Sequence, residues 1–139
     1  MPRTTGDVYS EITTMLFRNS DIKTIMWIEK SQPHRQTKDH KEGITQIFTN
    51  GFNYGKVYGC LEIIFSGRKA ELSEVYPITW KSAFKLSKDK ELSMRACKFL
   101  YPESEKLIYG PKGGALDGIA EAILIAHYGY LQYKRRLVK

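Results

Sequence analysis

Apolar and polar positions along the chain follow two patterns, one typical of helices and one typical of buried strands. Apolar side chains recur at helical spacing in residues 7–18, 44–67 and 115–129, the last of which reads ALDGIAEAILIAHYG. Two shorter runs are rich in β-branched and aromatic residues, as strands are: DIKTIMWIEK at 21–30 and AELSEVY at 70–76. We therefore expect strands interleaved with helices in an α/β architecture.

Two shorter helices are predicted between the second strand and the last helix. The first, ITWKSAFKL at 78–86, starts beside Pro77, which stops the strand. Ser87 is the expected N-cap of the second helix, and Pro102 ends it. The apolar positions expected to face the core from this second helix are Leu92, Ala96, Phe99 and Leu100.

Three glycines mark the helix predicted at 44–67. Gly51, Gly55 and Gly59 stand four residues apart, so they form one smooth stripe on a helix. Glycine costs a helix about 1 kcal/mol relative to alanine, so three of them call for a packing reason. We expect close contact with a sheet or another helix, and the stripe is equally suited to a dimer face.

Two acidic residues lie on the apolar face of the last predicted helix. Asp117 and Glu121 share that face with Leu124 and Tyr128. Their Cβ atoms would be roughly 5–6 Å apart, so the two carboxylates repel and a positive group should lie near them. Glu29 ends an apolar strand, where α/β proteins open their ligand crevice. Three carboxylates suit a hard cation such as Mg²⁺ or Mn²⁺.

Each acid also has a plain structural interpretation. Acidic residues in the first turn of a helix are favoured by the helix dipole, and an exposed pair of them usually has no functional role. Glu29 could pair at the surface with Lys30 or Arg35. The position of the acidic pair on the apolar face favours a site.

Charge and composition narrow the class of protein. The chain has 139 residues, with 22 lysines and arginines against 15 acids and a formal net charge of +7, which favours polyanionic partners. The only two cysteines, Cys60 and Cys97, lack metal-site spacing and are expected to be reduced thiols. No apolar signal segment or membrane-length run is present. A soluble, intracellular single domain over residues 1–139 is therefore expected.

Basic residues collect in the polar stretch that follows the first strand. SQPHRQTKDHKEG at 31–43 contains Pro33 and Gly43, which argue against regular structure. We expect a basic loop there. Its candidate DNA-binding residues, with the lysine just before it, are Lys30, Arg35, Lys38 and Lys41.

Five stretches of the chain carry a likeness to a known family. They are MWIEKSQP, TNGFNYGKVYGCLEIIF, VYPITWKSAFKLSKDKELS, FLYPE and DGIAEAILIAHYG, and they span about residues 22–129. In their order and spacing they resemble the RuvC-type Holliday junction resolvases, most closely the phage-like members of this branch of the RNase H-like nucleases. The fold that this resemblance implies is a mixed sheet flanked by helices.

The resemblance also implies an activity. Proteins of this family are metal-dependent endonucleases, usually homodimers, that cut four-way DNA junctions by symmetric incisions in the cytoplasm, at the nucleoid or in a phage-infected cell. By its match to the family motifs, Glu29 corresponds to the strand glutamate, and Asp117 and Glu121 correspond to the paired acids that hold Mg²⁺ or Mn²⁺. Lys81 matches a basic position that approaches phosphate, and the loop after Glu29 resembles the segment that enters the junction.

One departure from the family concerns its first strand. Family members open with a strand that bears a Gly-x-Asp motif, whose aspartate is a metal ligand, whereas MPRTT before Gly6 and Asp7 cannot form a buried strand. We expect a domain that lacks the first hairpin, two neighbouring strands and this aspartate, with weak or no cleavage. A non-catalytic DNA-binding module, supported by the tail residues Lys134, Arg135 and Arg136, and a dimerisation module are the alternatives.

Overall fold

The computed structural model describes most of the chain as helices joined by a small sheet. The described residues are 5–18, 22–30, 43–66, 70–87, 89–111 and 113–138. The helices and strands are α1 (Thr5–Arg18), β1 (Thr24–Glu29), α2 (Gly43–Ser66), β2 (Ala70–Val75), α3 (Pro77–Ala83), α4 (Lys90–Leu100), a 3₁₀ turn (Pro102–Ser104), α5 (Glu105–Ile108) and α6 (Asp117–Leu137). The α/β class is therefore confirmed for these residues. None of their helices has the length and apolar character needed to cross a bilayer.

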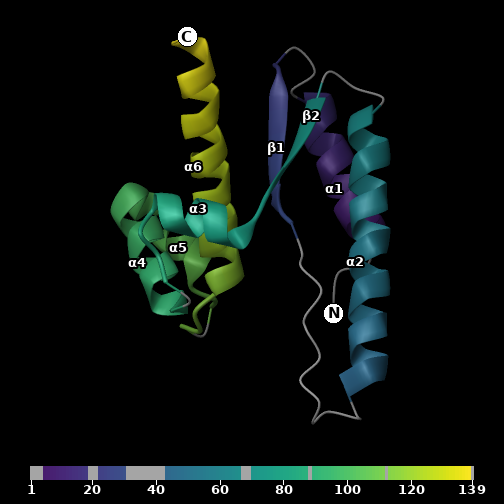
Figure 1. Ribbon diagram of the computed structural model, residues 1–139, viewed down its shortest axis with the longest axis horizontal. Coiled ribbons are helices and arrows are strands. Elements are labelled where there is room, and N and C mark those ends of the chain that lie inside the picture. The colour runs from purple at the N-terminus through teal and green to yellow at the C-terminus, as the bar shows by residue number, and fades with distance from the viewer. Residues whose placement is uncertain are drawn as a thin grey trace. The chain divides into compact units, whose positions relative to one another are not determined.

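The two strands form a parallel pair. They run in the same direction, and α2 makes the crossover between the end of β1 and the start of β2 (Figure 1). A parallel pair requires such a crossover because a tight hairpin can join only antiparallel strands. Just beyond β1, the amide of Lys30 donates a hydrogen bond of 2.8 Å to the carbonyl of Val75. The ends of the two strands, where Glu29 lies, are thus held in register.

The chain divides into two compact units. Unit 1 comprises Met1–Met26 and Ser31–Leu72, and unit 2 comprises Trp27–Lys30 and Ser73–Lys139. In unit 1, α1 packs against α2. Among the side chains of unit 1 that the structure describes, the buried apolar ones are Leu16, Leu61, Ile64 and Phe65. This division does not test the expectation of one domain, which stays a prediction.

Unit 2 is built around α6. Helices α3, α4 and α5 all contact α6 and lie around its N-terminal half (Figure 1). Its core consists of Val75, Trp80, Met94, Cys97, Ile108, Ala120, Leu124 and Ile125. Trp80 is the largest side chain in this core and is fully buried. All three candidate acidic residues belong to this unit.

Among the glycines that the structure describes, Gly129 on α6 has the closest side-chain neighbour. Gly129 is buried, and a Cβ atom at this position would lie 2.2 Å from Cδ1 of Trp27. The Trp27 ring also meets Tyr128 edge-on, with ring centroids 5.6 Å apart. Real Cβ atoms do not come within such a distance of a neighbouring atom, so α6 needs glycine where it passes Trp27.

The expected reason for the glycine stripe of α2 is wrong within the described part of the chain. A Cβ atom added at Gly51, Gly55 or Gly59 would meet no described atom within 4 Å. Four-residue spacing makes a smooth stripe, but spacing alone does not bring a second surface to it.

The capping and the buried face of α4 also differ from expectation. Asp89, not Ser87, is the N-cap, because its side chain accepts a hydrogen bond from the amide of Glu91 at 2.9 Å. The predicted core residue Phe99 is 85% exposed, and Leu100 is exposed too. The buried residues of α4 are Ser93, Met94 and Cys97. The apolar pattern misled here because the buried face includes a serine, whose hydroxyl has a polar partner on α6.

Candidate active site

Glu29 is held at the end of β1 by a buried tryptophan. The Trp80 side chain donates a hydrogen bond from Nε1 to Oε2 of Glu29 at 2.8 Å. Trp80 lies in α3, which begins with Pro77 at a position where the ring fixes a helical φ and no amide donor is needed. A buried indole N–H needs an acceptor, and a carboxylate is a strong one. Glu29 is therefore fixed from the interior of unit 2.

Glu121 is bound by two groups from different helices. Lys81 of α3 donates from Nζ to Oε1 of Glu121 at 2.8 Å, and both side chains are less than one-quarter exposed. The hydroxyl of Ser93 on α4 donates to the same oxygen at 3.4 Å, and Ser93 itself is fully buried. A partly buried carboxylate is costly unless it is paired in this way. Lys81, which the family likeness places near phosphate, here neutralises Glu121.

Asp117 has a lysine of its own. Nζ of Lys90, at the start of α4, lies 2.7 Å from Oδ2 of Asp117. The hydrogen bond from Lys90 lowers the pKa of Asp117 below its ordinary value, and the same bond raises the pKa of Lys90. Lys81 adds a weaker electrostatic effect that also lowers the pKa of Asp117. Asp117 is therefore ionised at neutral pH.

The two lysines explain how the acidic pair is tolerated. The sequence predicts a positive group beside Asp117 and Glu121, and the structure places one ammonium group against each carboxylate. Residues 90 and 93 of α4 face residues 117 and 121 of α6, so one side of α4 holds both acids. These contacts between α4 and α6 could not be predicted from the sequence, because Lys90 and Asp117 are 27 residues apart and Ser93 and Glu121 are 28 residues apart.

Two consecutive residues of α3 bind the acid at the end of β1 and one acid of α6. Trp80 binds Glu29, and Lys81 binds Glu121. Nζ of Lys81 also lies 5.1 Å from the ring centroid of Trp80, which is within cation–π range. A short chain of contacts in unit 2 therefore connects Glu29 with Glu121.

The donor chemistry of these acids fits a divalent cation, although they are not arranged as a ready coordination shell. Carboxylate oxygens are the ligands that Mg²⁺ prefers. Across the described residues, no group of three or more histidines, cysteines, aspartates or glutamates lies together in a metal-holding arrangement. Lys81 and Lys90 hold positions against the carboxylates that a cation would require, so both would have to withdraw. The metal site stays a prediction.

The structure describes only some of the candidate DNA-binding residues. Arg35, Lys38 and Lys41 lie outside the described residues. Lys30 is described, with its Nζ 3.2 Å from Oε2 of Glu74 and 5.3 Å from the ring centroid of Tyr76. The hydrogen bond with Glu74 raises the pKa of Lys30, so it remains charged at neutral pH. The structure leaves their role with DNA untested.

Three residues of this cluster were missed as site residues in the sequence: Trp80, Lys90 and Ser93. Trp80 is a fully buried core residue and is also the donor to Glu29. A tryptophan beside a lysine just after a strand is a weak signal, and neither Lys90 nor Ser93 carries a motif of its own. Only packing of α4 on α6 identifies them.

The Lys90–Asp117 pair gives a testable pH dependence. We expect Lys90→Met to raise the pKa of Asp117 toward its ordinary value, because the hydrogen bond from Lys90 is the largest cause of the depression. In the wild type the lowered pKa of Asp117 contributes stability that is present above the unfolded-state pKa and is lost as pH falls through the folded-state pKa. NMR titration of the Asp117 carboxyl carbon measures this shift.

A second lysine on α4 provides the matched control. Lys98 pairs with Glu105, so Lys98→Met removes the same charge from the same helix without touching Asp117. It should leave the titration of Asp117 unchanged. An equal rise in both variants would mean that net charge, rather than the direct bond, sets this pKa.

Comparisons with known proteins identify no family for this chain. No protein-family model matches the sequence, and no curated protein matches it.

Proposed function

We propose that this chain is a metal-dependent endonuclease domain of the RuvC type that acts on four-way DNA junctions. The observation that carries the proposal is the link between acids of distant segments. Glu29 at the end of β1 and Glu121 on α6 are bound by the consecutive residues Trp80 and Lys81. Asp117 stands one helical turn before Glu121, so the three acids expected from the family likeness all lie in unit 2.

The arrangement of the elements supports the same proposal. Ligands of α/β proteins bind beyond the carboxyl ends of parallel strands, and Glu29 is the last residue of such a strand. Helix α6 then supplies acids from its first two turns. The RNase H-like mixed sheet is proposed from the family likeness, because the described residues contribute only the two parallel strands to a sheet.

Each residue has a role in this proposal. Glu29, Asp117 and Glu121 would hold Mg²⁺ or Mn²⁺, which supplies activation of water and stabilisation of the leaving oxygen. Lys81, once released from Glu121, would place its ammonium group against the phosphate. Lys30 and the loop residues Arg35, Lys38 and Lys41 would bind the DNA backbone. A four-way junction is two-fold symmetric, so a homodimer would present one site to each of two strands.

Metal binding and cleavage together test the proposal. We expect Mn²⁺ to raise the melting temperature of the wild type, since a ligand that binds only the folded state stabilises it. Glu121→Gln and Asp117→Asn should lose this shift. In a cleavage assay with Mg²⁺ or Mn²⁺, we expect weak cutting at most; a four-way junction should be cut in preference to a linear duplex of the same sequence, and Glu29→Gln should abolish this weak cutting.

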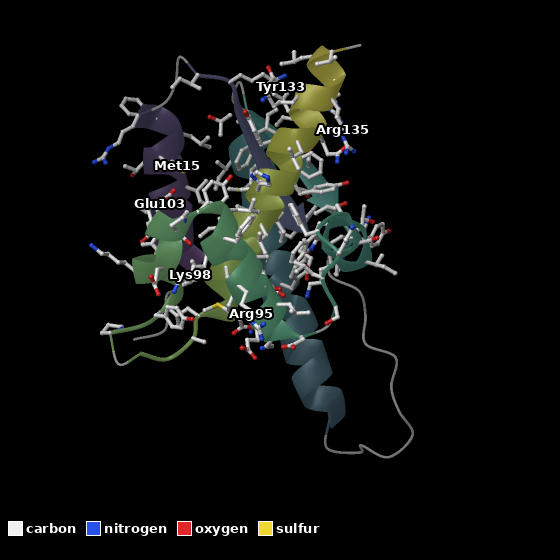
Figure 2. The ribbon with its side chains drawn as sticks, turned by 90° about the vertical axis from the view of Figure 1, so that its left-hand side faces the viewer. Met15, Arg95, Lys98, Glu103, Tyr133 and Arg135 are labelled. Atoms are coloured by element: carbon white, nitrogen blue, oxygen red, sulfur yellow. The ribbon has the colours of Figure 1, made fainter. Side chains whose placement is uncertain are left out.

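Glu103→Gln is the matched control. Glu103 is an exposed acid in the 3₁₀ turn and lies on the surface in Figure 2. Its replacement removes one negative charge from unit 2 and should leave the metal-dependent shift intact. A shift that persists in Glu29→Gln, Asp117→Asn and Glu121→Gln would rule out these acids as ligands.

A DNA-binding module without catalysis is the second candidate. The observation that favours it is that Lys81 and Lys90 already neutralise the two acids of α6. Such a module would bind the junction in the presence of EDTA, with affinity that falls steeply as salt rises, and would show no metal-dependent stabilisation.

A further inference from the structure

A row of exposed apolar side chains runs along α6 on the side that faces away from the core of unit 2. We name this row the outer stripe, and its members are Ile119, Ala122, Ala126, Tyr130, Tyr133 and Leu137. All six are exposed, the four larger side chains to between 38% and 67%. Helices α3, α4 and α5 lie around the N-terminal half of α6, and the C-terminal half extends beyond them (Figure 1). Tyr133 lies on its last turns (Figure 2). The outer stripe is therefore left uncovered by the core that unit 2 builds.

The spacing of the six residues places them on one face of the helix. Successive members stand three, four, four, three and four residues apart, which matches the helical repeat of about 3.6 residues. At about 100° per residue, all six fall within a sector of about 80°. Leu124, which is buried in the core, lies on nearly the opposite side of α6.

Helix α6 is apolar on almost every side over this length. Between Ile119 and Tyr133, the polar side chains other than tyrosine are Glu121, His127 and Gln132, and none of these three belongs to the outer stripe. A surface helix normally keeps one polar face, whereas a helix that is hydrophobic all round is normally buried. The outer stripe therefore calls for a partner that covers it.

The sizes of the side chains make the outer stripe complementary to its own reverse. Ala126 and Tyr130 stand equally far from residue 128, one on each side of it. Ala122 and Tyr133 are centred half a residue from the same point, and the two aliphatic ends of the stripe are centred on residue 128 as well. In an antiparallel pair of α6 helices, each alanine of one copy would thus face a tyrosine of the other. Large side chains would fit over small ones at the usual interhelical distance of about 8–10 Å. A surface that fits itself is what a two-fold dimer requires.

Charge favours the antiparallel direction over the parallel one. Lys134, Arg135 and Arg136 lie in the last turn of α6, whereas the acids of this helix, Asp117 and Glu121, lie in its first two turns. A parallel pair would set the two basic ends side by side, with like-charge repulsion and aligned helix dipoles. An antiparallel pair brings the basic end of each helix toward the acidic end of the other and opposes the two dipoles.

We propose that the outer stripe is an interface with a second copy of this chain, in which two α6 helices pack antiparallel about a two-fold axis near residue 128. The inference supplies a contact surface for the homodimer and rests on the proposed function in that respect alone, since it requires neither metal nor DNA. Glu121 lies seven residues from the axis, so the acidic residues of the two copies would be separated by about 20 Å along the helices. Each dimer would then carry two sites related by the two-fold axis.

A charged substitution in the outer stripe tests the interface. We expect the full chain to sediment as a dimer at micromolar concentration, and Ala126→Glu to weaken the dimer about a hundredfold, because the added carboxylate is buried there without a partner. Ala126 is exposed in the single chain, so this variant should keep the far-ultraviolet circular dichroism spectrum of the wild type. Ala83→Glu is the matched control, since Ala83 is an exposed alanine of α3 outside the outer stripe, and this variant should remain dimeric.

Mixing two variants tests the antiparallel register. Tyr130→Lys should also be monomeric by itself, because it too buries an unpaired charge in the interface. Mixed in equal amounts with Ala126→Glu, it should restore a dimer within about tenfold of the wild-type affinity. The antiparallel register sets position 126 of one copy against position 130 of the other, so the two new charges form an ion pair and the second alanine–tyrosine contact stays native. A parallel pair would not bring these positions together, and the mixture would stay monomeric.

Three results would overturn the inference. A wild type that stays monomeric would show that another partner, or another part of the chain, covers the outer stripe. A dimer that survives Ala126→Glu would use a different surface, and its loss in Gly55→Leu would place that surface on the glycine stripe of α2. Monomeric variants that mixing does not rescue would exclude the antiparallel pairing.

The inference and the nuclease proposal can fail separately. A dimer that behaves as expected but shows neither metal-dependent stabilisation nor junction cutting would overturn the nuclease proposal and keep the interface. Metal-dependent stabilisation of a wild type that is monomeric would do the reverse.

Discussion

Replacing Trp80 with alanine should lower the free energy of unfolding of unit 2 by about 3–5 kcal/mol, the range for deleting a large buried aromatic side chain. Trp80 is 0% exposed and packs in a core that includes Leu124 and Ile108. The change also removes the hydrogen bond to Glu29. Urea unfolding followed by circular dichroism measures the loss.

Trp80→Phe separates packing from hydrogen bonding. Phenylalanine keeps most of the aromatic volume but has no N–H group to donate to Glu29, so we expect a smaller loss of about 1–3 kcal/mol. If the nuclease proposal is correct, this variant should also lose more free energy of metal binding than free energy of unfolding, because Glu29 loses the hydrogen bond that positions it. Equal stability of the alanine and phenylalanine variants would show that packing around Trp80 contributes little.

Gly129→Ala should destabilise unit 2 by about 2 kcal/mol or more, which is typical of overpacking a tight site. A Cβ atom at residue 129 would lie 2.2 Å from Cδ1 and 2.6 Å from Cγ of Trp27. These atoms are at the base of the indole, so the whole ring must move. Trp27 and Trp80 are the only tryptophans, and the fluorescence of Trp27 in a Trp80→Phe background reports the displacement.

A second glycine of α6 is the control for this prediction. Gly118 has open space around its Cα, with no described atom within 4 Å of an added Cβ. Gly118→Ala should therefore stabilise the helix by up to about 1 kcal/mol through helix propensity alone. The two substitutions are chemically identical, so opposite signs would establish that contact with Trp27, not the loss of glycine, determines the result.

Most elements could be predicted from local patterns. The strand predicted at 21–30 is observed as Thr24–Glu29, and the one predicted at 70–76 as Ala70–Val75. The long helix predicted at 44–67 is Gly43–Ser66. Periodicity and strand-forming composition act over a few neighbouring residues, so they are readable in sequence. The last helix, predicted at 115–129, is observed as Asp117–Leu137 and runs on into the basic tail.

Tertiary partners could not be predicted in this way. Lys81 meets Glu121 across 40 residues, and Trp80 meets Glu29 across 51. No local pattern records which lysine will face which acid. The prediction of the buried face of α4 was wrong for the same reason. Ser93 is buried with a polar contact to Glu121, while the apolar Phe99 remains exposed.

Helix α3 has a mechanical consequence for the two acids that it binds. Trp80 and Lys81 are neighbours in a helix of 7 residues, so their side chains leave its axis about 100° apart. Any rotation of this short helix displaces both hydrogen bonds together. Helix α3 therefore couples the position of Glu29 to the position of Glu121. An inserted residue between Trp80 and Lys81 would turn one bond by a further 100° and advance it by about 1.5 Å. The relative position of Glu29 and Glu121 therefore depends on the geometry of one turn of α3.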